Sequence, residues 1–96
     1  MIILNVFFDV TLEHETKFLK LLKHMVVESI KEDGCSLYQL WLNAHDPYSY
    51  VLVEHRETQD HLAAHGETPH WFDFNDTVNG YLKSDYEEHH YNEIPR

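Results

Sequence analysis

The chain has 96 residues, of which 43% are hydrophobic and 14% aromatic, so we expect one small folded domain over residues 1–96 rather than a disordered segment. Its 17 acidic and 7 basic side chains give a formal net charge of −10, which argues against nucleic acid and anionic membranes as partners because both attract basic surfaces. Cys35 is the single cysteine, which excludes a disulfide within the chain and favours a reducing cytoplasm.

Residues 2–9 are rich in β-branched and aromatic residues and almost continuously apolar, which predicts a strand buried on both faces. Asn5 interrupts this strand. An unpaired buried amide would cost about 1–3 kcal/mol, so Asn5 needs a partner in the protein or in a ligand. The segment lacks the basic start of a signal peptide, and no apolar run approaches the roughly 20 residues of a membrane span. We therefore expect a soluble, cytoplasmic protein.

A helix is predicted over residues 12–32, with Thr11 as its N-cap and Asp33-Gly34 at its end. Its apolar positions recur every three or four residues, as in an amphipathic helix that covers a core. The stripe of this spacing contains Phe18, Leu21, Leu22, Met25, Val26, Ser29 and Ile30.

Two further strands are predicted over residues 35–43 and 48–56, joined as a hairpin by the turn at 44–47. Glu54 and Arg56 are two residues apart on the second strand, so they share one of its faces. A carboxylate that enters the interior of a sheet needs such a counter-charge. The pattern leaves open whether this pair is structural or functional.

After the hairpin, two helices are predicted over residues 59–65 and 69–80, separated by Gly66. Thr68 is placed as the N-cap of the second helix, and Pro69 occupies its first position, where proline is favoured. His65 and His70 stand on either side of this joint. The second helix carries an apolar stripe formed by Trp71, Phe74, Val78 and Tyr81.

Alternation over residues 84–92 allows a last strand, although it is the weakest signal in the chain. The resulting order β-α-β-β-α-α-β predicts an α+β, ferredoxin-like fold with a four-stranded antiparallel sheet. Such a sheet has helices on one face only. Because the first strand is apolar on both sides, we expect two sheets to pack face to face in a homodimer.

Nine histidines raise the question of a metal site, but no segment has the ligand spacing of known metal motifs. His61 and His65 lie four residues apart and could supply two ligands, whereas His89 and His90 would point to opposite faces of a strand. Cys35 lacks a nucleophile elbow, and the chain has no glycine-rich phosphate loop. We therefore expect no metal and no cofactor.

The chain resembles the antibiotic biosynthesis monooxygenase family over roughly residues 2–92. The resemblance rests on the strand-ending Glu54, Leu62-Ala-Ala-His65 and Thr68-Pro-His70-Trp71, together with Phe18, Glu32-Asp-Gly-Cys35 and Tyr38. It implies a dimeric α+β barrel in which each subunit has a pocket between its sheet and its helices. It also implies cofactor-free oxidation of a quinol or a related aromatic small molecule, with the reduced substrate itself activating O2.

By this resemblance, Asn5 would hydrogen-bond a substrate oxygen and His65 would accept a phenolic proton, with both residues in one pocket. Histidine titrates near neutral pH, which suits a general base. Tyr38 and Trp71 would form walls of the pocket. The remaining expected substrate-binding residues are Glu54, Arg56 and His70.

The chain departs from the family pattern at several positions. Arg56 stands where most relatives carry tryptophan. In the haem-degrading branch the pocket tryptophan falls at His65 and the haem-ligating histidine at Asn75, so haem is not expected. Two alternatives stay open. The first is isomerisation of a phosphorylated sugar related to autoinducer-2. This reaction needs a cationic pocket, and Arg56 is the chief cation that the chain offers for it. The second is a non-catalytic dimeric module that binds a small ligand.

Overall fold

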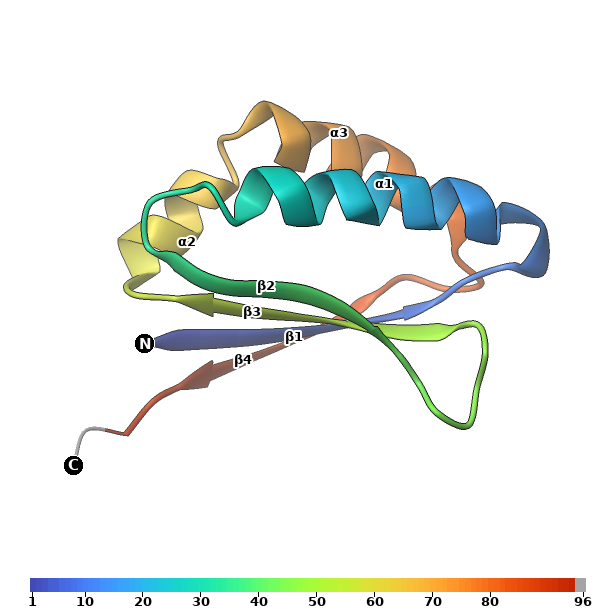
Figure 1. Ribbon diagram of the computed structural model, residues 1–96, viewed down its shortest axis with the longest axis horizontal. Helices are drawn as coiled ribbons and strands as arrows, with labels where there is room; N and C mark the ends of the chain where they lie inside the picture. The colour runs from blue at the N-terminus through green and yellow to red at the C-terminus, as the bar shows by residue number, and fades with distance from the viewer. Residues whose placement is uncertain (95–96) are drawn as a thin grey trace.

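A computed structural model describes residues 1–94 of the chain, so the expected domain of residues 1–96 extends slightly beyond them. The expected order of elements is confirmed (Figure 1). The strands and helices are β1 (Ile2–Asp9), α1 (Glu15–Ser29), β2 (Cys35–Leu42), β3 (Ser49–Arg56), α2 (Gln59–His65), α3 (Pro69–Thr77) and β4 (Glu87–Asn92). Two short 3-10 turns, η1 (Leu12–His14) and η2 (Val78–Tyr81), precede α1 and follow α3.

The four strands form one antiparallel sheet in the order β2-β3-β1-β4, which confirms the ferredoxin-like α+β fold. The helices lie on one face of this sheet, and the opposite face is bare in the single chain (Figure 1). The weakly signalled last strand is present as β4, which is shorter than residues 84–92.

The helix boundaries differ from the predicted ones. The expected helix over 12–32 is α-helical only from Glu15 to Ser29. The Thr11 side chain caps no backbone N–H; its hydroxyl is hydrogen-bonded to His14 Nδ1 at 2.7 Å and donates to the Tyr81 carbonyl at 3.2 Å. The first turn therefore tightens into η1, as helix ends without a cap often do.

The core fills the space between the helices and the covered face of the sheet. Most of the stripe predicted on the first helix is confirmed: Phe18, Leu22, Met25 and Ser29 are buried, and Leu21 and Val26 are partly buried against the core. Ile30 is 45% exposed, because α1 ends at Ser29. Phe8 of β1 makes edge contacts with Phe18 of α1 and Phe74 of α3, with ring centroids 5.3 and 6.1 Å apart. These contacts fix α1 and α3 over β1.

In the single chain β1 is buried on one face only. Leu4, Val6 and Phe8 are buried, whereas Ile3 and Asn5 are half-buried and Phe7 is exposed. The pairing registers place further apolar side chains beside them on the bare face of the sheet. We call this surface the uncovered face; its apolar members are Ile3, Phe7, Leu37, Trp41, Val51, Val53 and Tyr91.

Gly34, in the loop between α1 and β2, has a positive φ of 77°, and a Cβ there would lie 2.2 Å from His61 Cγ. We expect Gly34→Ala to lower the free energy of unfolding by about 1–3 kcal/mol for the backbone alone, and further for the displaced imidazole. Urea unfolding monitored by circular dichroism measures this change. Gly80→Ala is the matched control, because a Cβ at Gly80 meets nothing within 4 Å. Equal losses in both variants would contradict the prediction.

Candidate functional site

A cavity of about 210 Å³ lies between the covered face of the sheet and the helices α2 and α3. Its walls are mainly apolar and come from several elements, including Leu4 and Val6 of β1, Leu52 of β3, Met25 of α1 and Phe74 of α3. Four of the residues expected at a substrate site also line it, namely Tyr38, Glu54, His65 and Trp71. The cavity thus brings four of the seven expected residues together.

The remaining three expected residues do not line the cavity. His70 and Arg56 are hydrogen-bonded to Glu32 instead. Asn5 is on the opposite side of the sheet, because Leu4 and Val6 face the cavity and successive side chains of a strand alternate. Its cross-strand neighbours are Val53 and His89 on the uncovered face. The expectation that Asn5 and His65 share one pocket is thus corrected for the single chain.

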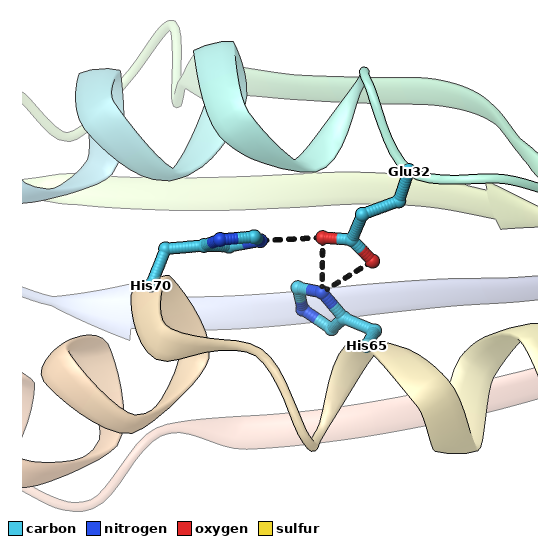
Figure 2. Close-up of side chains that lie close together, drawn as sticks. All are labelled: Glu32, His65 and His70. Atoms are coloured by element: carbon cyan, nitrogen blue, oxygen red, sulfur yellow. Dashed lines mark hydrogen bonds and ion pairs between the residues drawn. The ribbon is translucent and has the colours of Figure 1, made fainter.

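The polar centre of the site is Glu32, in the loop that follows α1 (Figure 2). Its carboxylate oxygens lie 3.0 and 2.9 Å from His65 Nδ1, and Oε2 lies 2.5 Å from His70 Nε2. Arg56 Nη1 donates to Oε1 at 2.9 Å. One carboxylate is therefore held by three side chains that come from β3, α2 and α3.

Arg56 of β3 binds this cluster through its guanidinium group. It is completely buried, and its Nε donates to Glu54 Oε1 at 2.7 Å, which confirms the expected pairing on one strand face. The guanidinium lies 5.8 Å from the centre of the Tyr38 ring. Within residues 1–94, Arg56 Nη2 is buried and has no hydrogen-bond partner. Because Arg56 bridges Glu54 and Glu32, it couples the cavity wall to the histidine pair.

The pKa shifts indicate which groups are charged. Burial raises the pKa of Glu32, but hydrogen bonds from His70 and His65 and the charges of His65 and Arg56 outweigh it, so the net shift is downward. Burial, followed by the charge of Glu54, holds the pKa of Tyr38 far above its usual value. Glu32 is therefore a carboxylate at neutral pH, and Tyr38 remains a phenol that cannot serve as a base.

Glu32 decides which nitrogen of His65 is free. A carboxylate only accepts hydrogen bonds, so His65 Nδ1 carries the proton that it shares with Glu32. In the neutral imidazole Nε2 then has a lone pair. No described residue hydrogen-bonds to Nε2, and His65 lines the cavity. His65 can therefore accept a proton from a molecule in the cavity while Glu32 holds its orientation.

Local capping explains why the two histidines meet. The Thr68 side chain accepts a hydrogen bond from Trp71 N, and its hydroxyl donates to the His65 carbonyl at 2.8 Å. The predicted N-cap at Thr68 and the proline at the first helical position are both confirmed. This joint ends α2 and starts α3 within a few residues, which brings His65 and His70 to the same carboxylate.

Sequence reasoning missed Glu32 as a site residue. It was expected as the last residue of the first helix but lies in the loop after α1, and its partners are 24 to 38 positions further along the chain. The available signal was its place in Glu32-Asp-Gly-Cys35, one of the segments that carry the family resemblance. Glu88 and His90 of β4 were also missed; both line the cavity from the sheet edge.

The remaining candidates for chemistry lie elsewhere. His61 faces Thr58 and Asp33 rather than His65, so the two histidines of α2 do not form a ligand pair. His89 packs against Phe7 on the uncovered face while His90 lines the cavity, which confirms that they point to opposite faces. Burial raises the pKa of Cys35, so its thiol is a poor nucleophile.

Among residues 1–94, no helix has the length and apolar character needed to cross a membrane.

Comparison with known proteins identifies the family. Residues 1–77 match the sequence model described as antibiotic biosynthesis monooxygenase. The chain belongs to this family. Solved structures of antibiotic biosynthesis monooxygenase proteins agree. A Nitrosomonas europaea protein whose name assigns it to the family has a TM-score of 0.92 at 26% identity, with 99% of this chain and 100% of that chain covered.

A Deinococcus radiodurans protein with the same family name gives a TM-score of 0.91 at 23% identity and covers 100% of this chain and 95% of its own. A conserved protein of Methanosarcina mazei gives a TM-score of 0.93 at 22% identity, with 97% of this chain and 92% of that chain covered. These two likenesses establish the shared fold. No curated protein matches the chain. The antibiotic biosynthesis monooxygenase fold is thus established.

Proposed function

We propose that the protein is a cofactor-independent monooxygenase that oxidises a quinol or a related aromatic small molecule. The observation that carries the proposal is the hydrogen bond between Glu32 and His65 Nδ1, which leaves Nε2 as a base at the wall of an apolar cavity. Family membership supports the same class of reaction.

In the proposed reaction His65 takes a phenolic proton, and the resulting phenolate is the electron donor to O2. One oxygen atom enters the product and the other leaves as water, so a hydroquinone and O2 give a hydroxyquinone and H2O. The substrate loses four electrons, which are the four that O2 accepts. No external reductant is needed, and the protein supplies the base and the apolar cavity.

The size of the cavity restricts the substrate. A cavity of about 150 Å³ lined by apolar side chains can hold benzene. The cavity here, at about 210 Å³, suits one aromatic ring or a compact pair of rings. Trp71 and Tyr38 supply aromatic walls for such a ring. We therefore propose a one- or two-ring quinol rather than a larger polycyclic phenol.

The charge of the cavity does not support a sugar phosphate. Glu54 and Glu88 line it, and no lysine or arginine is among its lining residues in the described part of the chain. Arg56, the cation expected to bind a phosphate, already forms ion pairs with Glu54 and Glu32. A phosphorylated substrate would meet negative potential, so the isomerase alternative is disfavoured.

Oxygen consumption tests the proposal. With a panel of one- and two-ring quinols, we expect uptake of one O2 per quinol consumed, formation of an oxygenated product that incorporates ¹⁸O from ¹⁸O2, and no product under argon. Boiled protein is the control for autoxidation. Turnover that is unaffected by removing O2 would favour an isomerase. Quinol binding measured by calorimetry without any product would favour the non-catalytic module.

We also propose that the working form is a homodimer in which two uncovered faces pack together. Phe7 and Trp41 of this face are 42% and 58% exposed in the single chain, which is unfavourable for large apolar side chains arranged as one surface. A twofold axis would bury both copies of this surface at once. Asn5 would then lie at the interface, where its amide could find the partner that a buried amide requires.

A further inference from the structure

Glu32, His65 and His70 place three ligand atoms around a common point. One carboxylate oxygen and two imidazole nitrogens all lie within 4.8 Å of one another. Their side chains are 14%, 6% and 12% exposed, so they form a shielded group rather than a chance surface cluster. Two histidines and one carboxylate are a ligand set that Zn²⁺, Co²⁺ and other divalent transition metals bind in proteins.

We propose that these three residues bind a divalent transition-metal ion, and that the bound ion switches off His65 as a base. The spacing permits it. With metal–nitrogen distances of about 2.0–2.1 Å, neighbouring ligand atoms of a tetrahedral site are ~3.3 Å apart. Glu32 Oε2 is now 2.9 Å from His65 Nδ1 and 2.5 Å from His70 Nε2, so each gap has to open by less than 1 Å.

The surrounding charges also accommodate an ion. Glu32 and Glu54 contribute two negative charges and Arg56 one positive charge, which leaves the cluster at −1 when the histidines are neutral. Arg56 Nη1 binds Oε1, so Oε2 stays directed at the histidines, as an outer partner does for a ligating carboxylate. The positive charge of Arg56 opposes the ion, and its contact with Glu54 partly offsets that effect.

Metal binding moves the proton of His65. Without an ion, Nδ1 carries the proton shared with Glu32, and Nε2 keeps the lone pair of a side chain that lines the cavity. An ion on Nδ1 requires that lone pair, so the neutral imidazole has to carry its proton on Nε2 instead. The cavity then faces an N–H donor in place of a base. This consequence rests on the proposed function, whereas binding of the ion does not.

Titration of EDTA-treated protein with Co²⁺ and Zn²⁺ tests the site. We expect one Co²⁺ per chain with visible d–d absorption, displacement by Zn²⁺, and at least tenfold weaker binding in both Glu32→Gln and His70→Ala. His61→Ala is the matched control, because His61 lies on the same helix as His65 but outside the group. Unchanged affinity in His70→Ala, or a loss only in His61→Ala, would overturn the site.

The proton shift has its own readout. Nitrogen-15 NMR of the imidazoles should show the proton of His65 on Nδ1 in the metal-free protein and on Nε2 with Zn²⁺ bound. Circular dichroism confirms that each variant is folded before it is titrated. Binding with the Nδ1 proton retained would overturn the switch. Absence of quinol oxidation would defeat the proposed function and leave this titration and its NMR signature unaffected.

Discussion

Replacing His65 by alanine is expected to lower quinol turnover by about 10²–10⁴-fold, the range that a general base contributes. The physical reason is the loss of Nε2, the proposed base, on a side chain that lines the cavity and that Glu32 orients through Nδ1. Because His65 is buried and hydrogen-bonded, the substitution also costs stability, and removing one such partner costs about 1–3 kcal/mol. Turnover therefore has to be expressed per folded molecule, with the folded fraction taken from urea unfolding.

Asn5→Ala is the informative comparison for His65→Ala. Its side chain lies on the uncovered face, so we expect turnover per folded dimer to change far less than in His65→Ala. A comparable loss in Asn5→Ala would support the role that the family resemblance assigns to Asn5. If neither variant loses activity or ligand affinity beyond its loss of stability, His65 is a structural residue and the proposed base is wrong.

An aspartate at Val51 is expected to raise the dissociation constant of the homodimer by about 10³-fold or more, since a buried unpaired charge costs several kcal/mol and 1.4 kcal/mol is tenfold. Val51 pairs with Phe7 on one side and Trp41 on the other, at the centre of the uncovered face. A twofold axis places the new charge in both subunits, so the two copies also repel each other.

Sedimentation equilibrium at micromolar concentration measures this effect. The native protein should sediment at twice its chain mass of 11.5 kDa, and Val51→Asp at the chain mass, with a lower unfolding midpoint because dimerisation and folding are linked. Phe72→Asp is the matched control, since Phe72 is an exposed apolar residue of α3, on the side of the sheet opposite the uncovered face. A native protein that sediments as a monomer would show that the sheets do not pack together in solution.

Local patterns in the sequence determined most of the fold. The three- and four-residue spacing on α1 identified all four of its buried side chains, and alternation placed Glu54 and Arg56 on one face of β3. The cap at Thr68 located the start of α3. These features depend on the period of a helix or strand and on side chains that bond to neighbouring backbone, so they can be deduced from a few adjacent residues.

Tertiary structure alone decided the site. Alternation shows that Asn5 and its neighbours point to opposite faces, but only the packing of α1 and α3 decides that Leu4 and Val6, and not Asn5, face the cavity. The meeting of Glu32 with His65 and His70 spans 33 and 38 positions and depends on how α2 and α3 dock against the sheet. No local period encodes such a contact, because it is set by the combined packing of separate elements.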